Sequence, residues 1–254
     1  SASATLIERH AGRAGEQVFT NSVSEIVVGD GAHLTHHLWS HAEETESRIG
    51  RIQVHLGRDA QYTNRGFWLS GGLARTDLNV VFEGAGGSAN LVGLYVVGED
   101  QHIDNHVTVD HAQPHCTSRM EYKGVLGGKS RGVYNGRVVV RKDAQKTDSE
   151  QSNRNLLLSA NADVNTKPEL EIYADDVKCG HGTTVGQLDE QQLHYLRTRG
   201  IPLVQARRML TEAFAADVLA SLGSEALQEE LTPLVTAQLV RAHVDDEQRA
   251  ARAA

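Results

Sequence analysis

The sequence predicts a mainly β protein in which a long β body precedes a small α-helical region. From about residue 5 to residue 186, short runs alternate apolar and polar residues, and Gly, Asn and Asp separate the runs. A period of two between turn residues is typical of β-strands. After residue 187 the apolar residues recur at the spacing of amphipathic helices. We therefore expect a β core over residues 1–186 and a helical C-terminal domain over residues 187–254.

Six runs show the strand pattern most clearly. They are RIQVHLG (51–57), TDLNVVFEG (76–84), ANLVGLYVVG (89–98), NHVTVD (105–110), GRVVVRK (136–142) and ELEIYADDV (169–177). The runs start at uneven intervals, which favours a β-helix or a sandwich over a propeller and leaves the choice between those two open. The run ELEIYADDV is predicted to be the last strand, so that Cys179 and His181 would follow it.

Three helices are expected after residue 187. Asp189 is placed to cap the first helix, and Gly200 followed by Pro202 predicts a stop and a restart. The second helix is expected to end at Gly223, and Ser224 would cap the third.

Composition and charge exclude several classes of protein. The formal net charge is -8 and the pI is near 5.9, so the chain offers no basic surface for nucleic acid. Its 2 cysteines form no disulfide framework, and no apolar run reaches membrane-spanning length. We expect a cytoplasmic protein that binds neither nucleic acid nor membrane. The chain starts without methionine and enters strand-like sequence almost at once, so we also expect that an N-terminal region is missing.

The stretch GVLGGKS (124–130) ends like a phosphate-binding loop. However, the first glycine of that pattern would fall at position 123, where the chain has Lys123. Such a loop also needs a helix after it, whereas SRGVYNGRVVV continues as strand. We therefore expect no nucleotide site here.

A second stretch, HIDNHVTVDHAQPHC (102–116), is rich in possible metal ligands. On an alternating strand His102 and His106 share one face, while His111 and His115 have the opposite parity. We expect these imidazoles to face solvent or to be hydrogen-bonded, and we expect no closed four-ligand site.

Cys179 and His181 offer a thiolate and an imidazole two residues apart, flanked by Gly180 and Gly182. Such a pair could hold a metal, or the cysteine could be an inert, small buried hydrophobe. Two ligands cannot complete the four-coordinate sites typical of zinc or iron–sulfur clusters. If the pair binds metal, the other ligands come from elsewhere, most simply from a second chain.

Four segments resemble the core of the SufB/SufD proteins of the SUF iron–sulfur assembly system. They are HIDNHVTVDHAQPH, YKGVLGGKSRGVYNG, AQKTDSEQSNRNLLLSANADVNTKPELEIYADDVKCGHGTTVGQLD and YLRTRGIPLVQARRMLTEAF. The resemblance covers roughly residues 20 to 222 and is closer to the SufD branch. The SufD-like proteins have an ADDVKC-x-HG-x-TVG segment, which this chain matches, whereas the SufB-like proteins have an acidic residue in an HEA pattern at the same place. The matching residues are Cys179, His181, Gly182, Thr183 and Val185.

The resemblance implies a right-handed parallel β-helix followed by a helical domain that binds the SufC ATPase. It also implies a non-enzymatic scaffold subunit that pairs with SufB through β-helix edges. His181 would face a SufB cysteine at that interface, with Cys179 beside it. The isolated chain would bind no cofactor stably, and iron or an iron–sulfur cluster would be held transiently in the complex.

Two contact surfaces follow from these expectations. The polar face around Arg199, Arg207 and Arg208 is expected to be left for SufC. A free strand edge exposes unpaired backbone groups, so without SufB we expect a homodimer through ELEIYADDV or a neighbouring strand.

Two other functions remain open at this point. One is a β-helix interaction module with no metal role, in which Cys179 is inert. The other is a β-helix enzyme acting on polysaccharides, for which Asp104, Asp110, Asp175 and Asp176 are available, although an aromatic content of 5% offers little sugar stacking.

Overall fold

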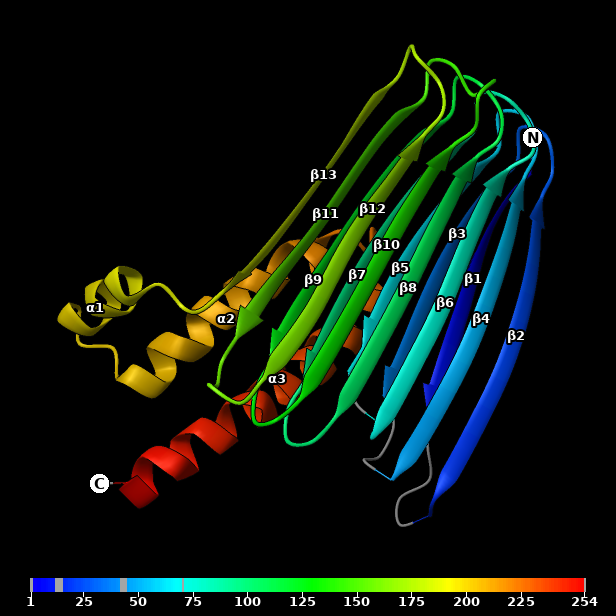
Figure 1. The fold of residues 1–254 in the computed structure, drawn as a ribbon. Helices are drawn as coiled ribbons and strands as arrows, with labels where there is room; N and C mark the ends of the chain where they lie inside the picture. Colours follow the sequence, from blue (N-terminus) through cyan, green and yellow to red (C-terminus); the bar gives the residue numbers. More distant parts are fainter. Residues whose placement is uncertain (1, 12–15, 42–44, 70, 254) are drawn as a thin grey trace.

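The computed structural model describes residues 2–11, 16–41, 45–69 and 71–253. Within these residues the chain forms a parallel β-solenoid followed by three helices, the last two of which pack along one side of it (Figure 1). The seven-stranded sheet contains, in spatial order, β1 (Ser3–Ala11), β3 (His33–His41), β5 (Gln61–Trp68), β7 (Ser88–Val97), β9 (Thr117–Leu126), β11 (Asp148–Leu157) and β13 (Lys178–Gly186). The six-stranded sheet contains β2 (Val18–Val28), β4 (Glu46–Leu56), β6 (Leu73–Phe82), β8 (His102–His111), β10 (Arg131–Val140) and β12 (Asp163–Ile172).

Successive strands alternate between the two sheets, so each coil contributes one strand to each. Every described strand pair is parallel and in register along its length, for example β6 with β8 and β7 with β9. This topology is that of a β-helix and excludes the sandwich. The predicted fold class, a parallel β-helix followed by helices, is therefore confirmed.

The interior of the solenoid is filled by every second residue of the strands. In β8, HIDNHVTVDH, half-buried and buried positions alternate strictly. Aromatic rings stack across coils, with 5.9 Å between the ring centroids of Trp68 and Tyr122 and 5.0 Å between those of Tyr122 and Tyr134. The largest buried apolar side chains of this interior are Ile52, Leu56, Tyr62, Trp68, Phe82, Leu91, Tyr95, Tyr122 and Tyr134.

The helices are α1 (Glu190–Thr198), α2 (Leu203–Ala220) and α3 (Glu225–Ala253). The carboxylate of Asp189 caps α1 by accepting from the Gln191 N–H at 2.8 Å. Gly200 and Gly223 follow α1 and α2 with φ of 85° and 66°, which glycine adopts at little cost. The predicted helix starts and stops are confirmed. No helix in the described part of the chain is both long and apolar enough to cross a membrane.

A second apolar cluster joins α2 and α3 to the outer face of the seven-stranded sheet, which we call the helix-covered face (Figure 1). Its fully or nearly buried members include Trp39, Phe67, Leu94, Val96 and Val125 on the strands and Ala215, Val218, Leu231, Val235 and Leu239 on the helices. The strands end at Gly186 and α1 begins at Glu190, but the helices and the sheet share this cluster. The division into two domains at residue 187 remains a prediction.

The Gly-Lys-Ser sequence forms the tight turn between β9 and β10. Gly128 has φ 59°, and the Ser130 hydroxyl donates to the Gly127 carbonyl at 2.7 Å. Because a strand follows this turn, the helix needed for a phosphate-binding loop is absent after Ser130, as predicted.

Candidate functional site

Cys179 and His181 lie within the last strand, β13, rather than after it. The prediction that ELEIYADDV is the last strand was therefore wrong, since β12 ends at Ile172 and β13 begins at Lys178. Gly180 and Gly182 make no turn: β13 pairs with β11 continuously from Lys178 to Gly186. The sequence KCGHGTTVG has no long apolar run, so its strand conformation comes from pairing with β11 rather than from propensity.

The register shows which way the two side chains point. Cys179 pairs with Ser149 and His181 with Gln151, and both of these β11 residues are buried in the interior. Because paired residues point to the same face of a sheet, Cys179 and His181 both point toward the interior of the last coil. Cys179 is half-buried and packs against the interior cluster, whereas His181 is exposed.

The environment of the thiol favours its protonated form. Burial raises the pKa of Cys179, the Ser149 backbone N–H partly offsets this by hydrogen bonding to the sulfur, and the Asp148 carboxylate adds to the rise in pKa. In the isolated chain Cys179 is therefore a thiol at neutral pH. A metal or a partner's positive charge would be needed to make it a thiolate.

The last coil is open on two sides. Strand β13 is the end strand of its sheet among the described strands, so one of its edges faces no other strand. On its outer face, a Cβ placed at Gly180, Gly182 or Gly186 would meet no atom within 4 Å. The thiol and the imidazole are thus two possible soft or borderline metal donors at an open end of the solenoid. No group of three or more His, Cys, Asp or Glu residues in the described ranges could hold a metal ion.

The histidines of residues 102–116 do not gather into one site. His102 and His106 lie on the outer face of β8, His111 points into the interior, and His115 lies in the following turn with φ 61°. His111 is hydrogen-bonded to the Ser118 hydroxyl at 2.8 Å, and burial lowers its pKa to about 4. The expectation of separate, solvent-facing or hydrogen-bonded imidazoles is confirmed.

Three of the four carboxylates considered for a polysaccharide site, Asp104, Asp110 and Asp176, are engaged in ion pairs. Asp104 pairs with Arg75 at 2.8 Å and Asp110 pairs with Arg141 at 2.8 Å, both on the outer face of the six-stranded sheet. Asp176 lies in the loop before β13, so these groups form no common groove. Nothing in this arrangement favours a pair of catalytic carboxylates.

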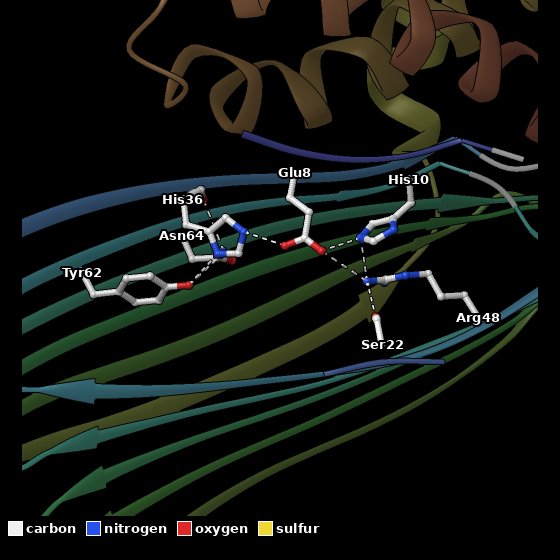
Figure 2. Close-up of polar contacts among 7 residues, drawn as sticks. All are labelled: Glu8, His10, Ser22, His36, Arg48, Tyr62 and Asn64. Atoms are coloured by element: carbon white, nitrogen blue, oxygen red, sulfur yellow. Dashed lines mark hydrogen bonds and ion pairs between the residues drawn. The ribbon is translucent and has the colours of Figure 1, made fainter. Parts of the chain in front are cut away.

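A polar cluster around Glu8, at the end of the solenoid opposite β13, was not predicted from the sequence. Glu8 contacts His10 Nε2 at 2.7 Å and His36 Nε2 at 3.2 Å, and His36 Nδ1 contacts the Tyr62 hydroxyl at 2.9 Å (Figure 2). Hydrogen bonds from the two imidazoles hold the pKa of Glu8 far below its ordinary value. Alternation could place Glu8 and His10 on one face of a strand, but the register that brings His36 beside them cannot be read from sequence.

This cluster is not suited to a cation. The Arg48 guanidinium lies with Nη2 2.8 Å from His10 Nε2 and occupies the position where a metal would approach that imidazole (Figure 2). Glu8 already accepts from both histidines, so its charge is compensated. The cluster joins strands of both sheets across the interior and is best understood as structural.

The three arginines predicted to face a partner differ in exposure. Arg199 is exposed, with its guanidinium 5.2 Å from the centroid of the Tyr195 ring. Arg207 and Arg208 are half-buried next to His243 of α3, and burial together with their charges lowers the pKa of His243 to about 4. Of the three, only Arg199 is exposed, and the partner-binding role expected for all three remains a prediction.

The exposed surface of α1 and α2 is instead partly apolar. Tyr195 is 59% exposed, Val204 40% and Met209 41%. These side chains lie on the outside because the inner side of α2 packs against α3 and the seven-stranded sheet, and α1 packs against α2. The helical spacing alone could not tell which of two mixed faces would be covered.

Comparison with known proteins identifies the family of this fold. Residues 1–214 match the family described as SUF system FeS cluster assembly, SufBD core domain. The chain is 34% identical over 230 residues to the iron–sulfur cluster assembly protein SufD of Escherichia coli, covering 91% of this chain and 54% of that protein. It is 35% identical over 223 residues to an iron–sulfur cluster assembly SufBD family protein of Mycobacterium tuberculosis, covering 85% of this chain and 56% of that one.

A third relative extends the match to another bacterial group. The SufD protein of Bacillus subtilis is 28% identical over 219 residues, which are 85% of this chain and 49% of that protein. The chain spans about half the length of the curated relatives it matches. Given the parallel β-solenoid, the helices that follow it and the match over residues 1–214, the chain belongs to the SufBD core family, on its SufD branch.

Proposed function

We propose that this chain is the SufD-type subunit of a SufB–SufC–SufD scaffold on which iron–sulfur clusters are assembled. The observation that carries the proposal is that Cys179 and His181 lie on the interior-facing side of an end strand that has one free edge among the described strands. Family membership supports the iron–sulfur context, and the relatives are named as iron–sulfur cluster assembly proteins.

The site is proposed to be one half of an interface site shared with SufB. Two donors leave a tetrahedral iron incomplete, and the free edge of β13 allows another strand to bring further ligands close to them. Iron and sulfide are the cargo of this site, so the isolated chain would hold neither stably. The raised pKa of Cys179 agrees with this, because the thiolate forms only when a cation or a partner stabilises it.

His181 is the more important of the two donors in this proposal. It is exposed at the open end and can reach a partner's thiol, whereas Cys179 is half-buried against the interior cluster. A neutral imidazole nitrogen can bind iron or accept a proton from a thiol, and alanine can do neither.

The test is the iron and acid-labile sulfide content of the complex co-expressed with SufB and SufC. His181→Ala is expected to abolish cluster loading, and Cys179→Ala to reduce it partly. His33→Ala is the matched control, since His33 is an exposed histidine on β3, remote in the strand order from β13. Circular dichroism checks folding. Normal loading in the His181→Ala complex would contradict the interface site and favour an interaction module without a metal role.

The SufC ATPase is proposed to dock on the outer surface of α1 and α2. Arg199 and the exposed apolar side chains Tyr195, Val204 and Met209 would make the contact, while Arg207 and Arg208 would support it from the half-buried layer below. The turn at Ser130 is not a phosphate-binding loop, which agrees with a complex in which a separate polypeptide, SufC, hydrolyses ATP.

Point substitutions are the appropriate test of SufC docking, because deletion of residues 187–254 would uncover the helix-covered face. Tyr195→Asp is expected to weaken capture of SufC at least tenfold. Glu229→Lys, at an exposed position on α3, is the control and should capture SufC normally. Unchanged capture by Tyr195→Asp would place the docking surface elsewhere.

In the absence of SufB we propose that the chain pairs with itself through the free edge of the last coil, β12 or β13. The charged residues Lys167 and Glu169 with Pro168 protect the edge of β12, so β13 is the better candidate. Thr184→Pro in β13 is expected to remove this contact, as measured by light scattering.

A further inference from the structure

Gln151 of β11 is a buried amide that lies next to His181. The two residues are in register on neighbouring strands, and both point toward the interior of the last coil. Gln151 is 1% exposed and lines the same cavity as Cys179 and His181. Neighbouring strands lie about 4.8 Å apart, so the side chains of an in-register pair can contact each other. His181 therefore has a buried amide beside it, on the side away from the free edge of β13.

The nitrogen of this amide is held by β10. Nε2 donates to the Gly136 carbonyl at 3.0 Å and to the Tyr134 hydroxyl at 3.3 Å. A carbonyl can only accept, so the reversed amide, with Oε1 facing Gly136, is excluded. Gly136 also makes room for the amide, because a Cβ at this position would lie 1.9 Å from Gln151 Nε2. The six-stranded sheet therefore fixes the orientation of the amide independently of His181.

The oxygen of the amide, Oε1, is buried and accepts no hydrogen bond from any described residue. A buried acceptor without a donor is costly and rare, so it points to a donor that can reach it. On β9 the residue in register with Gln151 is Met120, which has no polar hydrogen. The hydroxyl of Ser149 is already hydrogen-bonded to that of Ser118 at 2.8 Å. Of the two residues in register with Gln151, only His181 has an N–H to offer.

From the fixed amide and its free oxygen we infer that Gln151 positions His181. The exposed imidazole turns toward β11, donates its Nδ1–H to Gln151 Oε1 and keeps Nε2 unprotonated for iron or a partner's thiol. Nδ1 is the ring nitrogen closer to the strand, and Nε2 is the one farther from it. A hydrogen bond to one ring nitrogen determines which nitrogen is free to bind and fixes the direction of the ring. Gln151 is thus a positioning residue, and this inference rests on the proposed function of His181.

NMR of the isolated chain reads the tautomer directly, without iron or a partner. At about pH 8 the ¹⁵N shifts of labelled histidine distinguish Nδ1–H from Nε2–H in neutral rings, and the signal that is missing in His181→Ala belongs to His181. An unrestrained neutral histidine favours Nε2–H in water, so a major Nδ1–H form is expected only if Gln151 accepts from it. A major Nε2–H form in the parent chain would overturn the inference. The donor to Gln151 would then be the buried Tyr122 hydroxyl, which also lacks a described partner.

Two substitutions separate this hydrogen bond from packing. Gln151→Met keeps the length of the side chain and removes the acceptor, so the tautomer ratio of His181 is expected to shift at least about fivefold toward Nε2–H. Asn155→Leu is the matched control, because it also removes a buried amide of β11 but lies in register with Val185, and it should leave the ratio unchanged. If Gln151→Met does not fold, Gly136→Ala displaces the amide and should shift the ratio in the same direction. An unchanged ratio in the folded variant would overturn the inference.

The complex co-expressed with SufB and SufC provides the second arm. Gln151→Met is expected to lower its iron and sulfide content about tenfold, a loss typical of residues that orient a metal ligand, and Asn155→Leu should load normally. Normal loading in Gln151→Met, with none in His181→Ala, would overturn the inference and leave the proposed function standing. Normal loading in His181→Ala would instead contradict the proposed function, and the tautomer ratio would still decide whether Gln151 holds the ring.

Discussion

The two outer faces of the solenoid differ in what covers them. The helix-covered face of the seven-stranded sheet lies under α2 and α3, and its residues, such as Leu94 and Val96, are fully buried. The outer face of the six-stranded sheet, which we call the bare face, points to solvent. It carries ion pairs, for example between Arg75 and Asp104 at 2.8 Å.

The amino-acid sequences of the strands show this difference between the two faces. In β7 the segment LVGLYVV is apolar at successive positions, because one set of side chains fills the interior and the other packs under the helices. In β8, HIDNHVTVDH, the apolar residues Ile103, Val107 and Val109 all face the interior, and the outward-facing residues are polar. A continuous apolar run within a β-helix therefore indicates which coils a helix covers. Four predictions test how far the two faces differ in energetic terms.

The largest effect is expected for a charge placed under the helices. Val96→Asp would bury a carboxylate without a partner beneath α2 and α3, which should cost at least about 4 kcal/mol of unfolding free energy. Val133→Asp, on β10 of the bare face, places the same group at a half-buried position and should cost less than about 1 kcal/mol.

Chemical denaturation of both variants measures this contrast. Equal losses would mean that the helices are not held firmly on the sheet. If only Val96→Asp loses stability while keeping its strand signal in circular dichroism, the helix-covered face is the weaker point of the fold.

The second prediction concerns pH and uses one buried histidine from each region. His111 in the interior and His243 in α3 each have a folded pKa lowered to about 4 by burial. Both are neutral when folded, so the unfolded chain binds protons first as the pH falls below about 6.5. Above about pH 6.5 the two neutral histidines do not reduce the free energy of unfolding. As the pH falls toward 4, the free energy of unfolding decreases by up to about 3 kcal/mol for each group.

Denaturation curves between pH 7 and pH 4 check this expectation. His243→Gln should remove the part of the acid-dependent loss that belongs to His243, while His111 and His37, whose pKa burial also lowers, keep the rest. If His243→Gln left the pH dependence of the free energy of unfolding unchanged, His243 would already be solvated in the folded protein.

The fold could be predicted further than the site. Period-two runs and the change at residue 187 were enough for a β body and three helices, because strand and helix periodicities are local properties of sequence. The strand Lys178–Gly186 could not be found in this way. Its glycines and threonines lack the pattern, and it is extended because β11 offers it a parallel edge.

The same limit explains the cluster around Glu8. Its members come from strands far apart in sequence, and only the register of the coils brings His36 next to Glu8. For Cys179 and His181, spacing alone allowed a shared side or a turn between them. The pairing with Ser149 and Gln151 decides in favour of a shared side.

The third prediction concerns Lys123, which anchors α2 on the helix-covered face. Its buried ammonium group donates to the Phe214 carbonyl at 3.1 Å and pairs with Asp217 near the end of that helix. Lys123→Met keeps the apolar stem and removes these bonds, so it should cost about 2 kcal/mol. Arg154→Met is the matched control, since Arg154 pairs with Glu121 at 2.9 Å in solvent. Arg154→Met is expected to lower the free energy of unfolding by less than about 1 kcal/mol, and chemical denaturation of both variants measures the difference.

The smallest effect is expected on the bare face, at Arg75. This arginine bridges Asp77 on its own strand, at 2.9 Å, and Asp104 on β8, at 2.8 Å, with its side chain 37% exposed. Water and salt screen such pairs, so Arg75→Met should cost no more than about 1 kcal/mol at low ionic strength. The cost should shrink toward zero in 1 M salt, where the screening length is about 3 Å. Denaturation at low and high salt measures this dependence. A loss that persists in high salt would mean that the bare face is held by packing of the arginine stem, and the contrast between the two faces would then be one of degree rather than of kind.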